Sequence, residues 1–484
     1  MTQSVSTGMA YLMASEFSFI LSNYLLHILV ARSLGPVKYG IYGILMSLYL
    51  INRAFLNTGF PRAVSKVIAE YSNFSGVIMK VSLQLQVIIV IFFTAGYFFL
   101  ARFLATNFLN DPSLSYYIIT LGFLIFPLSL MSLYSTGYMG GLRLFKEQAF
   151  IKFLFPLLRV IFVLFFIILG FEIFGTLIGT FLASLVSLFI CLRIVRGVHI
   201  FPVKINKESK YFAKRMISFG IPVSISAIVG ASVRNVNVLF VKYFLGENVA
   251  VGIYTAAATL SNIPYMVFTV LPLILVPSIS KALASQNRLL AQKYLYQSLR
   301  YSLLILGPIT ILLSATASDV MGILYGQTYI SGAIALQVLL FSALLLSIIV
   351  ILGSALAANG KPYFETLSIL IVLGIMVLLN FYYIPKYGIY GAALSSLFST
   401  LFGLILVIFL IRYYLQQIFH FLSFLRIGLV CGIIYFLAYY WHYNGFFVFF
   451  TYSLLGFLYL LLLYLFGEIS SEDITILKKV IRGE

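Results

Sequence analysis

Long apolar stretches dominate this 484-residue sequence and constrain its fold more than any other feature. Hydrophobic residues make up 62% of the chain, charged residues make up 9%, and the mean hydropathy is +1.07. A helix needs roughly 20 mainly apolar residues to cross a bilayer, because lipid leaves every backbone N–H and C=O to be satisfied within the helix. The pattern predicts an all-α polytopic membrane protein with about 14 transmembrane helices. The predicted spans are residues 9–31, 39–60, 79–101, 115–138, 148–170, 173–192, 216–241, 250–276, 299–317, 331–357, 363–384, 388–411, 422–441 and 446–467.

Few residues offer metal or disulfide chemistry. Cys191 and Cys431 both fall in predicted spans, so neither indicates a disulfide framework or a metal site. The four histidines are scattered and have no spacing typical of zinc ligands. We therefore expect no metal and no bound cofactor. The first span carries Glu16 and has neither a basic segment before it nor a small-residue cleavage site, so we expect it to be retained.

The net charge of +18 is interpreted as a topology signal. Short cytoplasmic loops of membrane proteins are enriched in Lys and Arg, and most of the basic residues here fall on one side if the N-terminus is inside. The sequence thus predicts a multi-pass protein of the cell (inner) membrane with both termini cytoplasmic. Anionic lipid headgroups account for the positive charge, and we expect no nucleic-acid partner. The basic residues assigned to external loops are Arg32, Lys38, Arg102, Lys242 and Lys386.

A duplication is indicated by motifs that recur about 212 positions apart in the same order. Because six spans is an even number, the second copy enters the membrane in the same direction as the first. This predicts two six-helix lobes related by a pseudo-two-fold axis along the membrane normal. The predicted divisions are residues 1–205 for the first lobe, 206–415 for the second, 416–467 for two additional spans and 468–484 for a cytoplasmic tail. The recurring motifs are Leu34-Gly35 and Leu245-Gly246, Gly40-Ile41-Tyr42 and Gly252-Ile253-Tyr254, and Pro61 with Ser65-Lys66 and Pro277 with Ser280-Lys281.

Four ionisable residues lie deep within predicted spans, namely Glu16, Arg53, Arg159 and Arg234. Such residues are costly in lipid and normally face a cavity or a partner. Three cations against one acid leave an excess of positive charge that water or an anionic ligand would satisfy. Guanidinium donates two parallel hydrogen bonds to phosphate oxygens, so a pyrophosphate suits this excess. Asn52 and Asn57 flank Arg53, and Asn235 and Asn237 follow Arg234, so these amides are candidates for contacts with sugar hydroxyls.

Each of these residues also has a structural alternative. Arg53 and Arg234 lie near enough to the ends of their spans to extend toward lipid headgroups. Arg159, three residues after Pro156, is a candidate either for substrate contact or for pairing with a backbone carbonyl loosened by that proline.

A polar stripe in the first span is the candidate for ion coupling. Glu16, Asn23 and His27 are spaced by seven and four residues, which places them within roughly 40° of one helical face. A carboxylate at membrane depth either couples H+ or Na+ movement to transport or pairs with one of the arginines.

Five short motifs carry a resemblance to a known family, namely Ala31 to Pro36, Tyr39 to Tyr42, Gly59 to Lys66, Ala358 to Lys361 and Tyr387 to Ala392. Together they resemble the multidrug, oligosaccharidyl-lipid and polysaccharide exporter superfamily, and within it the O-antigen-type polysaccharide flippases. The resemblance implies two lobes around a central cavity. It also implies a polyprenyl-pyrophosphate-linked oligosaccharide as substrate, moved from the cytoplasmic to the outer leaflet by alternating access. Arg53 looks like a match for a pyrophosphate-contacting position on the second span of relatives, whereas the first span carries no arginine.

A multidrug exporter and a membrane enzyme are the two alternatives to a flippase. A cation-coupled multidrug exporter of the same superfamily would bind organic cations and would need several acids within the membrane, whereas Glu16 is alone. A membrane enzyme would need acids and bases on an extended external loop, and the predicted external loops are short. We expect a transporter rather than an enzyme, most simply a monomer, with membrane lipids and, by resemblance, glycan-assembly proteins as partners.

Overall fold

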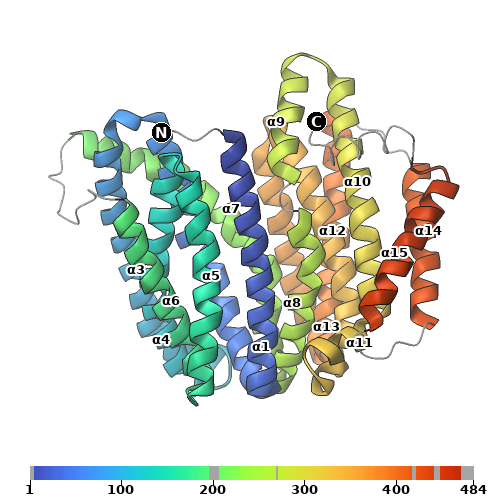
Figure 1. The fold of residues 1–484 in the computed structure, drawn as a ribbon, viewed down its shortest axis with the longest axis horizontal. Helices are drawn as coiled ribbons and strands as arrows, with labels where there is room; N and C mark the ends of the chain where they lie inside the picture. Colours follow the sequence, from blue (N-terminus) through green and yellow to red (C-terminus); the bar gives the residue numbers. More distant parts are fainter. Residues whose placement is uncertain (1–4, 196–206, 269–270, 417–420, 441–446, 470–484) are drawn as a thin grey trace. The chain divides into compact units, whose positions relative to one another are not determined.

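The computed structural model describes residues 5–195, 207–268, 271–416, 421–440 and 447–469, and this part of the chain is helical with no strand (Figure 1). The all-α prediction is confirmed, and within the described ranges the predicted spans fall on helices, with residues 250–276 and 299–317 each divided between two helices. Residues 196–206, which include the predicted lobe boundary, and residues 470–484 of the predicted tail lie outside the described residues. The elements are α1 (Val5–Arg53), η1 (Ala54–Gly59), α2 (Phe60–Glu70), η2 (Ser72–Phe74), α3 (Ser75–Phe103), η3 (Leu104–Phe108), α4 (Leu114–Ser132), η4 (Leu133–Met139), α5 (Phe145–Ile168), α6 (Glu172–Ile194), α7 (Lys207–Leu245), α8 (Asn248–Phe268), α9 (Leu271–Ala284), α10 (Arg288–Ala315), α11 (Ala317–Leu324), η5 (Gln327–Gly332), α12 (Ala333–Ala358), α13 (Pro362–Leu415), α14 (Phe421–Tyr440) and α15 (Phe447–Leu465).

The helix surfaces are those of a membrane protein. Within the described ranges, 10 helices are long and apolar enough to cross a bilayer. Large apolar side chains such as Phe92, Phe99, Ile168 and Leu378 are exposed, while many serines and threonines are buried. Exposed apolar surface on this scale is stable only where lipid replaces water.

Two long helices each contain two predicted spans. Gly35 interrupts α1 with φ 73° and ψ 173°, and Gly388 interrupts α13 with φ 58° and ψ −135°. Side chains other than glycine's rarely tolerate these angles, so the glycines set where the chain reverses. Pro36 then begins the second span of α1, where its missing N–H is harmless.

The described chain packs as two compact units, Met1–Thr255 (unit 1) and Ala256–Glu484 (unit 2). The predicted lobe boundary lies earlier, between residues 205 and 206. The two divisions differ because α7, which follows that boundary, packs against α1, α2 and α3 of unit 1. The units describe packing whereas the lobes describe a duplication, so the lobe division stays a prediction.

Unit 1 is a bundle in which α5 packs against both α1 and α6, and α4 packs against α3 and α6 (Figure 1). Its most informative contact joins the repeated Gly-Ile-Tyr motifs. A Cβ atom added at Gly40 would lie 1.9 Å from the carbonyl oxygen of Asn248, and one added at Gly252 would lie 2.1 Å from that of Pro36. Each glycine thus meets the residue four positions before the other glycine. This reciprocity is what a two-fold relation between the copies requires, and it agrees with the predicted duplication.

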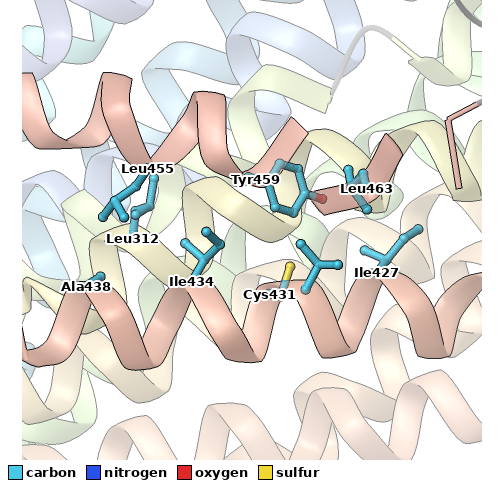
Figure 2. Close-up of a cluster of buried hydrophobic side chains, with 9 residues drawn as sticks. Leu312, Ile427, Cys431, Ile434, Ala438, Leu455, Tyr459 and Leu463 are labelled. Atoms are coloured by element: carbon cyan, nitrogen blue, oxygen red, sulfur yellow. The ribbon is translucent and has the colours of Figure 1, made fainter. Parts of the chain in front are cut away.

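In unit 2, α12 packs along α13, and α14 packs against α10 and α15. Figure 2 shows apolar side chains of α14 and α15 pointing toward one another, with Leu312 of α10 beside them. One end of this assembly is held by the buried carboxylate of Glu468, which accepts a 2.8 Å hydrogen bond from Arg300 Nε. The two additional spans are therefore fixed to α10 by both apolar packing and an ion pair. The apolar cluster consists of Leu312, Ile427, Val430, Cys431, Ile434, Ala438, Leu455, Tyr459 and Leu463.

Candidate functional site

The predicted polar stripe of the first span lies against α5. We call Glu16, Phe19, Asn23 and His27 the α1 polar face, because the four positions share one side of that span. Glu16 contacts Lys152, and Asn23 contacts Arg159. The seven-residue interval between the two partners on α5 equals that between Glu16 and Asn23, so the first span of α1 and α5 run in the same direction with matched polar positions.

Glu16 forms an ion pair with a lysine. Its Oε2 lies 3.1 Å from Lys152 Nζ, and the Glu16 side chain is 47% exposed. Arg62 of α2 is also within electrostatic range of the carboxylate. The alternative in which Glu16 pairs with an intramembrane arginine is therefore corrected: its hydrogen-bonded partner is Lys152.

Arg159 is the most deeply buried of the four ionisable residues predicted within the spans, with 7% of its surface exposed. Its Nη2 donates to Tyr42 Oη at 3.1 Å and contacts Met46 Sδ at 3.3 Å. Its Nε donates to Thr180 Oγ1 at 3.3 Å, and its Nη1 approaches Asn23 Oδ1 at 3.5 Å. Both spans of α1, together with α5 and α6, thus converge on one guanidinium.

All these acceptors are uncharged, and among the residues that the structure describes no carboxylate pairs with Arg159. None of the acceptors is a backbone carbonyl, so the alternative of pairing near Pro156 is wrong. Neutral acceptors orient the guanidinium but leave its positive charge uncompensated. In a medium of low dielectric constant, such a charge attracts an anion strongly.

His27 and two tyrosines hold the Arg159 acceptors in place. His27 Nδ1 lies 3.0 Å from Tyr39 Oη, and the His27 ring contacts the Tyr42 ring edge-on with centroids 5.4 Å apart. The Tyr39 and Tyr42 rings stack at 5.9 Å. His27 is therefore engaged in a buried aromatic contact within α1, on the same face as Asn23.

Arg53 joins the α1 polar face from the far end of α1. Its guanidinium carbon lies 5.0 Å from the centre of the Phe19 ring, within the range of a cation–π interaction. Neighbouring Asn52 donates to Leu48 O at 2.8 Å and also contacts Tyr97 Oη. Arg53 is half-buried, which leaves part of its surface accessible.

The backbone widens into the π-helical turn η1 directly after Arg53. Such turns free carbonyl groups from the regular ladder and are frequent at functional sites. The carbonyl of Leu56 accepts from Gln86 Nε2 at 3.0 Å, and that of Asn57 accepts from Ser132 Oγ at 2.7 Å. Side chains of α3 and α4 thereby satisfy the freed carbonyls and stabilise the turn that presents Asn57.

The remaining predicted residues lie on α7. Arg234 is half-buried, and Asn237 is buried with its amide donating to Tyr254 Oη at 3.3 Å. Tyr254 is the counterpart of Tyr42 in the repeated motif, so both copies use this tyrosine as a partner for a buried polar side chain. The structure gathers Glu16, Asn23, His27, Arg53 and Arg159 around α1, whereas Asn237 forms its own pair.

Sequence reasoning missed the residues that complete the site, chiefly Lys152, Tyr42 and Thr180. Lys152 was detectable, because it precedes Arg159 by the same interval that separates Glu16 from Asn23. Tyr42 and Thr180 come from other spans, and their proximity to Arg159 depends on helix packing that no local pattern specifies.

Many helices long and apolar enough to cross a bilayer, together with a buried basic side chain among them, define a multi-pass membrane protein. A model of the family described as polysaccharide biosynthesis protein matches residues 5–283. The chain belongs to this family.

Two relatives and two solved structures extend this comparison. An uncharacterized membrane protein of Methanocaldococcus jannaschii is 30% identical over 206 residues, which cover 41% of this chain and 40% of that protein. Stage V sporulation protein B of Bacillus subtilis is 23% identical over 355 residues, covering 67% of this chain and 68% of that protein. The chain therefore matches only two fifths of the first relative's length.

The structural likeness is more extensive. The lipid II flippase MurJ in an inward closed conformation has a TM-score of 0.78 at 16% identity, covering 95% of this chain and 98% of that one. An inward-facing multidrug resistance MATE family transporter of the MOP superfamily has a TM-score of 0.70 at 15% identity, with coverage of 81% and 94%. At these identities the likeness shows the fold, which a flippase and a drug transporter share.

Proposed function

We propose that this protein moves a polyprenyl-pyrophosphate-linked oligosaccharide from the cytoplasmic to the outer leaflet of the cell membrane by alternating access. The observation that most supports this proposal is the buried guanidinium of Arg159, whose hydrogen-bond acceptors are all neutral. A polyprenyl pyrophosphate brings an anion into the membrane, and a preoriented buried cation is the group that stabilises it there.

The charge balance of the α1 polar face supports an anionic substrate. Arg53, Lys152 and Arg159 all contact this face, and Glu16 is its only acid. Organic cations would be repelled by this excess, which disfavours the alternative of a cation-coupled multidrug exporter. Asn52, Asn57 and Asn237 are assigned to sugar hydroxyls, and Arg234 to a second phosphate contact from α7.

Ion coupling is proposed at Glu16. Its carboxylate is half-exposed and bound to one lysine, so a proton or Na+ that competes with Lys152 would release that contact. If this is correct, flipping accelerates when an H+ or Na+ gradient is imposed, and E16Q abolishes the acceleration while leaving the basal rate.

The test is transbilayer movement of a fluorescent undecaprenyl-pyrophosphate oligosaccharide in proteoliposomes. R159M and R53M are compared with R412M, which removes an exposed arginine at the end of α13. We expect movement to be lost in the first two variants and retained in the third. Equal movement in all three would overturn the assignment of the phosphate contacts.

A further inference from the structure

A buried ion pair lies at the end of unit 1 that the topology predicts to be external. The ammonium of Lys242, at the end of α7, is 3.1 Å from Asp111 Oδ2, 2.8 Å from Gly246 O and 2.8 Å from Asn248 Oδ1. The Lys242 side chain is 2% exposed and that of Asp111 is 18% exposed. Three oxygens thus take up the three donors of one buried ammonium.

The Asp111 carboxylate also accepts several hydrogen bonds besides the one from Lys242. Its Oδ1 accepts from Ser113 Oγ at 2.6 Å and from the Ser113 backbone N–H at 3.2 Å, and its Oδ2 also accepts from Asn248 Nδ2 at 3.3 Å. Burial acts to raise the pKa of the Asp111 carboxyl, but the hydrogen bonds from Ser113, Lys242 and Asn248 outweigh it and keep the pKa below its usual range. The carboxylate therefore stays charged and paired at neutral pH.

The reciprocal glycine contact lies beside this ion pair. Asn248 provides the carbonyl that would lie 1.9 Å from a Cβ at Gly40, while its side chain accepts from Lys242. The obstructing atom at each glycine is a backbone oxygen, which cannot move aside as a flexible side chain would. Only glycine at positions 40 and 252 lets the two segments approach this closely.

These contacts join the two copies of the predicted duplication, because Gly40 and Asp111 belong to the first copy whereas Lys242, Asn248 and Gly252 belong to the second. We propose that these five residues form an external seal, which holds the transporter shut toward the outside and must separate when substrate is released there. The inference rests on the proposed alternating access and names the contact that governs one of its two states.

The opposite end of α7 is tied to the first copy more weakly. Arg215 Nη2 donates to Glu70 Oε2 at 2.8 Å, but both side chains are exposed by a third or more. The hydroxyls of Tyr71 and Tyr211, 3.1 Å apart, are exposed as well. Water and salt compete with exposed pairs, so they contribute little, whereas a buried pair is costly to break. The asymmetry indicates a resting state that is closed outside and opens readily to the cytoplasm.

Distances between two spin labels, measured by double electron–electron resonance, test the seal without any substrate. Cys191 and Cys431, which are buried, would be replaced by serine, and spin labels would be attached to cysteines introduced at the exposed positions Asn107 and Glu247. We expect one short distance in the otherwise native protein. K242M and G40A should each add a longer distance, with the open-to-closed ratio rising by about tenfold or more.

Two further variants keep the test decisive. K38M removes the lysine of the exposed Lys38–Glu172 pair on the same side, and it should leave the distance unchanged. The swap D111K/K242D restores the pair with reversed polarity and should return the short distance, which separates loss of the seal from misfolding. Unchanged distances in folded K242M and G40A would overturn the seal. Longer distances in a protein that moves no lipid-linked glycan would instead retain the seal and reject the proposed substrate.

Discussion

Replacing Arg159 with methionine tests whether this residue binds substrate or stabilises the fold. The variant loses the two shorter hydrogen bonds, to Tyr42 at 3.1 Å and to Thr180 at 3.3 Å. Hydrogen bonds from a charged donor contribute about 1.5–3 kcal/mol each, so the loss is about 3–6 kcal/mol. The variant also removes a buried charge that no described carboxylate compensates, and the desolvation penalty of such a charge is several kcal/mol. The two terms nearly cancel, and we expect the free energy of unfolding to change by less than about 2 kcal/mol.

The buried cysteines provide the assay. Cys191 lies in unit 1 and is fully buried, so in a C431S background a thiol-reactive fluorophore reports the unfolding of unit 1 alone. For a unit of this size, 1 kcal/mol corresponds to about 2–4 °C, so R159M should shift Tm by no more than about 4–8 °C. Flipping per folded molecule should fall roughly 10- to 100-fold, the equivalent of one charge-assisted contact.

A large loss of stability without a loss of flipping would contradict a role for Arg159 in substrate binding. If R159M lowered Tm by much more than this range while the folded fraction flipped substrate at the native rate, Arg159 would be a structural residue. R412M provides the matched control, because its exposed guanidinium should affect neither quantity.

Four further outcomes follow from the same contacts. R300M leaves the buried carboxylate of Glu468 without its closest cationic partner and should destabilise unit 2 by about 3–5 kcal/mol in chemical unfolding followed at Cys431, whereas K38M, which removes an exposed pair, should cost less than about 1 kcal/mol. Neither cysteine should react with a maleimide in the folded protein, and rapid labelling would contradict their burial. The lowered pKa of Asp111 means that its contribution is complete above the ordinary Asp pKa of about 3.9 and is lost only as the pH falls through the lower folded value. The distance between labels at 107 and 247 should therefore be the same at pH 5 and pH 8. G252A should lengthen that distance as G40A does, because the two glycines make equivalent contacts, and an effect of only one would argue against the two-fold relation.

Local patterns were sufficient to predict the helices. Apolar length alone placed the helices of the described residues, because in lipid the backbone has no other way to satisfy its hydrogen bonds. The repeated Gly-Ile-Tyr motif also had a structural meaning that short sequence matches cannot convey, since Gly40 and Gly252 meet each other's copy. The boundary between packing units was not predictable from composition. It depends on α7 packing against α1 and α2, which the sequence around the predicted lobe boundary does not reveal.

The function of the site stays a prediction, and its contacts were only partly predictable. The spacing of Glu16, Asn23 and His27 places them on one side of the first span, where Glu16 contacts Lys152 and Asn23 contacts Arg159. The partners of Arg159 were missed because Tyr42 and Thr180 lie on different spans, and because Pro156, three residues earlier, offered only a local backbone carbonyl as a structural partner. Lys242 was assigned to an external loop from the topology, and its burial follows only from the convergence of Asp111 and Asn248 on its ammonium.

The proposed substrate class is tested by comparing the movement of two lipids and a dye in the same proteoliposomes containing the native protein. One lipid carries its oligosaccharide on a polyprenyl pyrophosphate, the other carries the same oligosaccharide on an uncharged polyprenyl ether, and the dye is an organic cation. We expect movement of the pyrophosphate-linked lipid, little movement of the uncharged lipid and no efflux of the dye. Efflux of the dye without movement of either lipid would contradict this expectation and would identify the protein as a drug exporter.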